Sequence, residues 1–527
     1  MTALAGTGAL VRLILRRDRL RLAVWIAALA VVAVATASAL ARVLPTEDSR
    51  ALFAAGITDN PAVISLIGPV FDPTTIGGLV AWRLGGLGAV AVGLLSLLTV
   101  VRHTRAEEEA GRRELVGSAA VGRHAPLAAA LLVTGCADLL IAVVVAAGLY
   151  ASRLPIAGAI ALGLSFAFTG WIFAALAALA AQLVENARTA SAIAGGILGV
   201  SYVARAVGDA SHGGLWWLSW TSPIGWAQRL RPFAGERWWL CAFATTAAIG
   251  LAVAAQALSA RRDLGAGLLP PRHGRATASP RLGGPLALAW LMQRGALLGW
   301  TIGFATTGAA LGSVAQSVAD LLNKSPRIRI LVTTLSGEVG IVDAYFTATF
   351  GILGLVAAGY GLQATLRLRS EEEDARAEPI LAAAVSRLRW ATSHLVFAVL
   401  GPALALATAG AAAGLVHGGP ADVPRLLTAA MAQLPAVWVL VGITLALFGL
   451  APRLARASWG VLAACVVVGQ LGRLLQLPAW IIDLSPFVHA PQVPGGAIDA
   501  APLLILLAVA SAFATAGLLG WQRRDLG

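Results

Sequence analysis

Apolar runs long enough to cross a lipid bilayer recur along almost the whole chain of 527 residues. A membrane-spanning helix needs about 20 predominantly apolar residues, and we identify about twelve such runs between short polar segments. The runs are residues 22–41, 77–101, 126–150, 155–183, 189–207, 238–258, 295–315, 343–366, 391–416, 424–450, 458–475 and 500–521. They predict an all-α polytopic membrane protein, because a helix satisfies its own backbone hydrogen bonds within lipid.

The composition excludes a soluble protein and argues against nucleic-acid binding. Hydrophobic residues make up 58% of the chain and charged residues only 12%, which is about half the charged share of soluble domains. The net charge is +13, but the arginines flank the apolar runs and form no separate basic domain. Their uneven distribution between the two sides predicts that both termini lie in the cytoplasm, and the arginine-rich, lysine-poor usage is typical of a bacterial protein. We therefore expect a multi-pass protein of the bacterial plasma membrane.

The chain contains an internal duplication. The segment from Arg105 to Arg123 recurs 264 residues later, from Arg369 to Arg387, and both copies hold three consecutive glutamates. The sequence Arg-Arg-Asp-Leu-Gly at 261–265 also recurs, at 523–527. Repeats in the same order predict two homologous halves. We place these at residues 1–267 and 284–527, joined by a cytosolic, basic linker rich in Pro and Gly at residues 268–283.

An even number of spans in each half gives both halves the same orientation in the membrane. The axis that relates them then lies along the membrane normal. Two equivalent halves facing a central axis are the geometry of a transport path served by a pair of identical cytosolic partners.

The duplicated acidic segment is the strongest candidate for a docking site. It lies between the second and third spans of each half, and a short amphipathic helix there can meet basic groups of a soluble partner or anionic lipid headgroups. The candidate residues are Glu107, Glu108, Glu109, Gly111, Arg112, Glu114 and Arg123 in the first half, and Glu371, Glu372, Glu373, Arg376, Glu378 and Arg387 in the second. The alternative is a solvated loop, and recurrence in both halves argues against it.

This segment resembles the coupling helix of the ABC-2 class of ABC exporter permeases (the type V exporter fold). The Ser-Pro after the fifth span of each half and the basic stretch before the first span are also similar to that class. A single chain with two such halves is similar to the fused permeases of polyketide antibiotic exporters of the tetronasin type. The second half departs from the pattern at Ala375, in the place of Gly111, and at Pro379, so its docking helix is expected to be less regular.

The resemblance implies two copies of a separate cytosolic ABC ATPase, which would bind ATP and magnesium. The chain itself offers no P-loop, because its sole lysine, Lys324, lacks the preceding glycine-rich turn. No residue spacing indicates a catalytic centre or a metal site, so we expect a permease without enzyme activity, cofactor or metal.

Charges within or beside the spans are candidates for the substrate path. Arg83 and Asp343 fall on the same face of equivalent helices and are expected to approach each other as an outer gate; the alternative is that each reaches the headgroups. Arg205 and Arg473 end equivalent spans. The resemblance implies that helices two and five line the path, where two arginines could attract an anionic amphiphile or instead act as interfacial anchors.

The resulting hypothesis is a permease subunit of an ATP-driven exporter for hydrophobic or amphiphilic compounds, with antibiotic or drug efflux favoured. An ion-coupled secondary transporter is one alternative, for which Asp138 is the main buried carboxylate. A lipid or glycolipid exporter of the ABC-2 class is another, and a membrane enzyme acting on lipid-linked sugars or a scaffold is less favoured.

Overall fold

The chain folds into helices that form two compact units. The computed structural model describes residues 3–58, 61–117, 121–211, 214–263, 265–269, 277, 282–324, 340–471, 478–496 and 499–524. All regular secondary structure among these residues is helical. The two units are Met1–Gly274 and Arg275–Gly527, so the chain divides at a point within the linker expected at 268–283.

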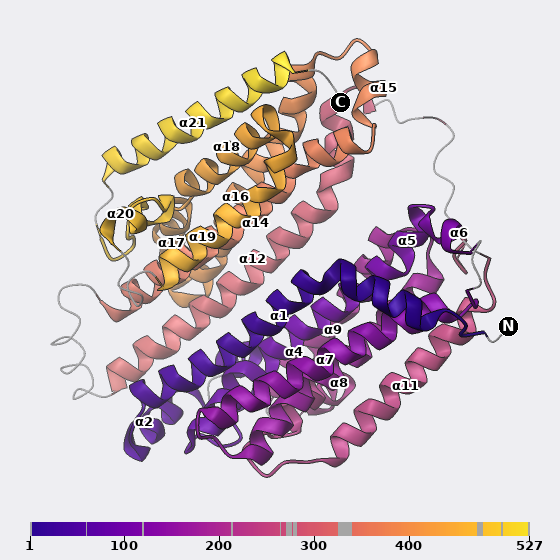
Figure 1. Cartoon of the computed structure of the whole chain (residues 1–527). Coiled ribbons are helices and arrows are strands. Elements are labelled where there is room, and N and C mark those ends of the chain that lie inside the picture. Colours follow the sequence, from indigo (N-terminus) through magenta and orange to yellow (C-terminus); the bar gives the residue numbers. More distant parts are fainter. Residues whose placement is uncertain are drawn as a thin grey trace. The chain divides into compact units, whose positions relative to one another are not determined.

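The first unit contains six long helices and several short ones (Figure 1). The long helices are α1 (Thr7–Val43), α4 (Ile76–His103), α7 (Ala125–Ala151), α8 (Ile156–Leu183), α9 (Ala187–Ala210) and α11 (Trp239–Ser259). The short ones are α2 (Glu47–Ile57), α3 (Pro61–Leu66), α5 (Arg105–Glu109), α6 (Arg112–Gly117), η1 (Trp216–Thr221) and α10 (Pro223–Arg229).

The second unit repeats this order with local differences. Its longer helices are α12 (Pro285–Lys324), α14 (Ile341–Glu373), α16 (Arg387–His417), α17 (Val423–Met431), α18 (Leu434–Leu450), α19 (Ser458–Leu471) and α21 (Ala500–Arg523). The short elements are α15 (Ala377–Ala382), η3 (Gly419–Ala421), η4 (Pro452–Ala457), α20 (Ala479–Ile482) and η5 (Pro486–His489).

Eleven helical segments of the described chain are long and apolar enough to cross a membrane. The expected run 458–475 is described only as α19, since residues 472–477 lie outside the described part. Two runs differ from expectation in form. The basic stretch before the first span is continuous with that span in α1, and the run 424–450 is divided into α17 and α18.

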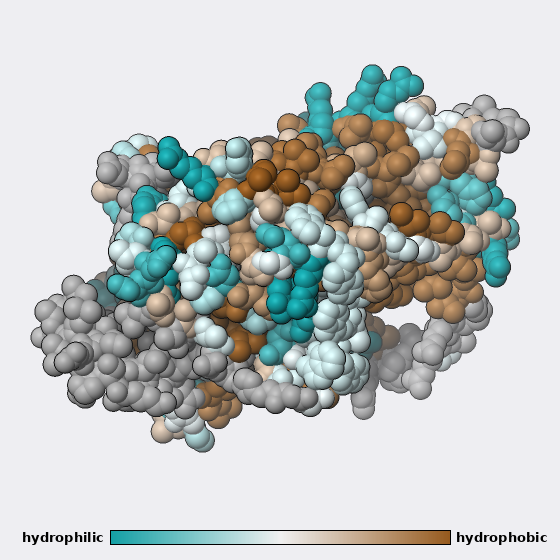
Figure 2. Space-filling view, turned by 90° about the horizontal axis from the view of Figure 1, so that it is seen from below, coloured by the Kyte–Doolittle hydropathy of each residue, from teal (hydrophilic) through white to brown (hydrophobic). Residues whose placement is uncertain are grey.

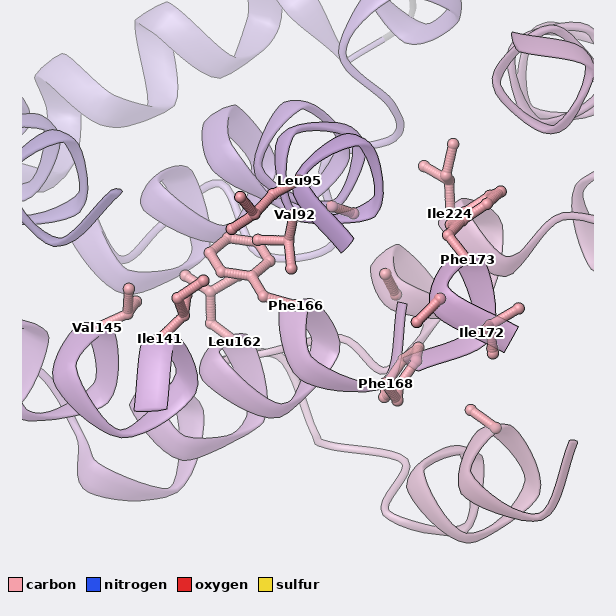
Figure 3. Packing of buried hydrophobic residues seen from close by; sticks show 14 of the residues in the cluster. Val92, Leu95, Ile141, Val145, Leu162, Phe166, Phe168, Ile172, Phe173 and Ile224 are labelled. Carbon is pink, nitrogen blue, oxygen red and sulfur yellow. The ribbon is translucent and has the colours of Figure 1, made fainter. Parts of the chain in front are cut away.

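Both units use the same packing scheme. In the first, α8 packs against α4, α7 and α11, and α1 packs against α7; in the second, α18 packs against α14 and α21, and α12 packs against α16. Side chains of α4, α7 and α8 point toward one another in the first core, as shown for Val92, Leu95, Ile141, Val145, Leu162 and Phe166 (Figure 3). Gly88 makes this approach possible, because a Cβ there would lie 2.4 Å from Cζ of Phe166.

Large apolar side chains also face outward. Leu20 and Val31 of α1 and Leu504 and Ile505 of α21 are each more than 60% exposed. Figure 2 shows one face of the molecule, on which hydrophobic residues form broad patches and hydrophilic residues gather in separate clusters. Because soluble monomers rarely expose contiguous apolar patches of this kind, these surfaces fit lipid contact, and the chain is an all-α polytopic membrane protein.

Candidate functional site

The duplicated acidic segment lies at one end of each unit. In the first unit it forms α5 and α6, near the N-terminus; in the second it forms the last turn of α14 and then α15, near the C-terminus (Figure 1). Backbone hydrogen bonds from Gly122 to Ala5 (2.9 Å) and from His124 to Ala3 (3.0 Å) fix the N-terminal residues beside this segment.

A buried carboxylate, that of Glu108, organises the segment in the first unit. Its side chain is 2% exposed and forms ion pairs with Arg105, Arg113 and Arg262; Nη2 of Arg262 lies 2.8 Å from Oε1. Arg262 follows the end of α11, and its Nε also donates to Oε1 of Gln182 at 2.7 Å. We call these four charged side chains the Glu108 cluster. It ties the acidic segment to the end of the last helix of the unit.

The second unit contains the equivalent contact. Glu372, whose side chain is 5% exposed, pairs with Arg524 at 2.6 Å and with Arg369 at 3.4 Å. The Arg524 guanidinium also lies over the rings of Phe448 (5.0 Å) and Trp521 (4.9 Å). We call Glu372, Arg369 and Arg524 the Glu372 cluster. Within each unit, the repeated acidic segment is thus ion-paired with the repeated Arg-Arg-Asp-Leu-Gly sequence, although the two are far apart along the chain.

A second pair of equivalent arginines reinforces this connection. Arg123 donates to the carbonyl oxygen of Ser259 (3.3 Å), the last residue of α11, and to that of Arg262 (2.8 Å), just beyond this helix. Arg387 donates to the carbonyl oxygen of Arg524 at 2.6 Å, and to two others at the end of α21. Cations at a helix C-terminus satisfy its free carbonyl groups and interact favourably with the helix dipole.

Crowding of like charges makes the Glu108 cluster dependent on its carboxylate. Burial, together with repulsion from Arg262 and Arg105, lowers the pKa of Arg113 to about 10. Burial also lowers the pKa of Arg262. Arg113 therefore stays charged at pH 7, and Glu108 offsets the repulsion among three guanidinium groups.

The first helix is bound to the same end of the first unit. Arg17 pairs with Glu107 at 3.0 Å, and Asp18, which is 1% exposed, lies 2.6 Å from His103 and 3.3 Å from Arg102. The basic stretch of α1 is therefore held against α4 and α5. Sequence reasoning did not single out Asp18 or His103, since a lone charge in a basic stretch carries no pairing signal.

Only part of the candidate docking set is available to a partner. Glu107 and Glu371 form ion pairs with Arg112 and Arg376, respectively, and Glu373 pairs with Arg456. Oε2 of Glu109 accepts the backbone N–H of Ala187 at 3.0 Å. The exposed members of the set are Glu109, Gly111, Arg112, Glu114, Arg123, Glu373, Arg376 and Glu378. Among these, Glu114 and Glu378 occupy equivalent positions on the short helices α6 and α15.

The turn between the acidic residues and the short helix has the same backbone in both units. Gly111 has φ +68° and Ala375 has φ +54°. The left-handed conformation costs a residue with a Cβ roughly 1 kcal/mol, so the alanine retains the turn at a cost in stability. The short helix is also retained, with Pro379 in its first turn, where the absent N–H is not needed.

We expect Ala375→Gly to stabilise the protein by about 0.5–1 kcal/mol, because it removes this steric cost. Gly111→Ala should destabilise by a similar amount, since no side chain or backbone atom lies within 4 Å of an added Cβ there and the cost is that of the backbone alone. Thermal unfolding of the purified protein measures both changes. Equal midpoints for the two variants and the parent would contradict the argument.

The candidate residues of the substrate path are placed as follows. Arg205, on α9, is fully buried, and its guanidinium donates to the carbonyl oxygens of Ile64 (3.3 Å) and Leu66 (3.2 Å) in α3. Arg473 lies outside the described residues. Arg83 is exposed on α4.

Asp343, at the start of α14, forms an ion pair with Arg425 of α17, within its own unit. The expected approach of Arg83 to Asp343 would join the two units and stays a prediction, as does a role of Arg205 in the path.

The pairing partners of the acidic residues were missed by sequence reasoning, although the signal was present. Arg262 and Arg524 belong to the repeated Arg-Arg-Asp-Leu-Gly sequence, which served only as evidence of duplication. A repeated basic motif and a repeated acidic motif, both adjacent to spans, could have been paired by charge alone.

The helices have spanning length and lipid-facing apolar surfaces, and the two units are packed alike with an equivalent ion cluster in each. These features define a polytopic membrane protein of duplicated architecture. The chain is 42% identical over 527 residues to the multidrug efflux system permease protein Rv1217c of Mycobacterium tuberculosis (strain ATCC 25618 / H37Rv), with 99% of this chain and 95% of that relative covered. The family model described as multidrug efflux system permease Rv1217c, C-terminal domain, matches residues 282–522. The chain belongs to this family of multidrug efflux permeases.

Proposed function

We propose that this permease is the membrane subunit of an ATP-driven exporter of the ABC-2 kind, similar in its fused form to the tetronasin-type permeases. It moves hydrophobic or amphiphilic compounds, including drugs and antibiotics, out of the cell. It lies in the bacterial plasma membrane with both termini in the cytoplasm. Two copies of a separate cytosolic ABC ATPase bind ATP and magnesium and dock on the acidic segments, one on each.

The observation that carries this proposal is the equivalent connection in the two units. In each, a buried glutamate of the acidic segment pairs with an arginine beyond the last helix, Arg262 or Arg524. A segment fixed in this way transmits a push to the helix bundle, because buried, hydrogen-bonded ion pairs resist separation. A freely moving loop would absorb the same displacement.

We expect the double variant Glu114→Lys with Glu378→Lys to weaken binding of the ATPase roughly tenfold, because two exposed charges of about 0.5–1 kcal/mol each are reversed at the docking surface. The measurement is co-purification and titration with a candidate cytosolic ABC ATPase, at low and high salt. Asp48→Lys is the matched control, since it reverses an exposed charge on α2 at the opposite end of the first unit (Figure 1). Unchanged binding by the double variant counts against docking at these segments.

The secondary transporter remains the second candidate, and Asp138 is the observation in its favour. Its carboxylate is fully buried between α4, α7 and α8, and Oδ1 accepts a hydrogen bond from Ser96 at 2.8 Å. Intramembrane carboxylates mark ion pathways in transporters. Export that continues without ATP and stops when the proton gradient is dissipated would support this candidate; export abolished by vanadate would support the ATP-driven one.

A further inference from the structure

A cavity of about 570 Å³ lies within the second unit, between α14, α19 and the segment that includes α20 and η5. None of the described residues that line it is charged; the polar side chains of this lining are Thr347, Gln433 and Gln492. Its size is within the range of about 300–1,000 Å³ that is typical of small-molecule sites. The cavity belongs to one unit, so it needs no residue of the other.

The cavity adjoins the point where the fourth span of the second half is interrupted. Residue Pro435 lacks the N–H that would otherwise donate to the carbonyl oxygen of Met431, and α17 ends there. The corresponding span of the first half, α8, is a single unbroken helix. Discontinuous helices form substrate sites in many transporters.

Gln433 stands at this break and presents a polar group to the cavity. It is 4% exposed, and its side-chain amide makes no hydrogen bond to any described residue. Gly354 of α14 makes room for it, since a Cβ at Gly354 would lie 3.0 Å from Cβ and 3.3 Å from Oε1 of Gln433. The amide lines the cavity, so a ligand bound there can form a hydrogen bond with it.

The unbroken span of the first half also contains a buried polar side chain. Thr169 of α8 is fully buried, and its hydroxyl donates to the carbonyl oxygen of Ser165 at 2.7 Å within that helix. Thr169 therefore serves as a reference for a buried polar group whose hydrogen bond is made within its own helix.

We propose that this cavity binds neutral amphiphiles that carry a carbonyl or hydroxyl group, and that Gln433 selects them by a hydrogen bond. The proposal rests on the proposed export function and names one class of its substrates. The described part of the lining is uncharged and gives a buried ionic ligand no counter-charge, and burying an unpaired charge is costly. The amide offers both a donor and an acceptor, so it can pair with either group of a neutral ligand.

The test uses the purified full-length permease in lipid nanodiscs and two fluorescent probes. Nile red is neutral and has a carbonyl acceptor, whereas diphenylhexatriene is a hydrocarbon of comparable length. Gln433→Leu should weaken Nile red binding about fivefold to tenfold, the value of one hydrogen bond, and leave diphenylhexatriene binding within about twofold. Thr169→Val is the matched control and should change neither, because its hydroxyl is satisfied within its own helix.

Unchanged Nile red binding by Gln433→Leu, or an equal loss for both probes in protein that elutes as a single species, overturns the proposal. The first result would mean that the amide is hydrated and takes no ligand. If Gln433→Leu does not yield folded protein, Gly354→Ala crowds the amide from α14 and should weaken Nile red selectively. The probe assay needs no ATPase, so it is independent of the docking experiment. If the ATPase does not dock on the acidic segments but the probe selectivity is as expected, the proposed ATP-driven mechanism fails and the proposed binding role of the cavity is retained.

Discussion

Glu108→Gln is expected to lower the stability of the protein by about 3–5 kcal/mol, the usual cost of removing one partner from a buried ion pair. The substitution keeps the shape of the side chain but leaves Arg105, Arg113 and Arg262 facing one another without a carboxylate. The acidic segment should separate from the end of α11. Thermal unfolding in detergent and protease cleavage between α5 and α6 measure the two effects.

The control is the neighbouring Glu109→Gln, since Glu109 is exposed and accepts one backbone hydrogen bond; we expect a change within about 1 kcal/mol. Adding Arg262→Met to Glu108→Gln removes one of the repelling charges, so the double variant should be more stable than the sum of the single effects implies. Additive effects would show that the two residues do not interact, and the cluster would lose its assigned role.

Arg205→Met should destabilise the first unit by about 3 kcal/mol or more, because the carbonyl oxygens of Ile64 and Leu66 lose a buried charged donor. Asp209 lies near Arg205 and is paired with Arg229 at 3.0 Å, so it would also lose one of its two neighbouring positive charges. The expected result is a lower unfolding midpoint and faster proteolysis near α3. Export of neutral and anionic compounds should fall together, since the guanidinium is buried among protein atoms.

Arg188→Met is the matched control on the same helix, because Arg188 is exposed. The unfolding midpoint of this variant should differ little from that of the parent. A variant at Arg205 that retains the parental midpoint and loses only anionic substrates would favour the substrate-path prediction over a structural role.

Much of the site could be foreseen because its signals are local. The repeat of three glutamates gave the position of the acidic segment, and the apolar runs gave the helices that flank it. Residue pairing could not be foreseen in the same way. Glu108 and Glu109 are adjacent and chemically alike, yet one is buried among three guanidinium groups and the other is exposed. Which face of a short helix is covered depends on neighbours that are distant in sequence.

The sequence by itself determined that the chain is a helical membrane protein, that it is duplicated and where its acidic segments lie. Hydrophobicity and internal repetition are properties of the residues alone, and spanning length follows from the thickness of the bilayer. The tertiary structure decided which carboxylates are paired, that Arg205 holds α3, and that a span broken at Pro435 leaves Gln433 beside a cavity. These features depend on close packing between segments far apart in the chain, and packing sets burial, which in turn sets the free energy of every charged and polar group.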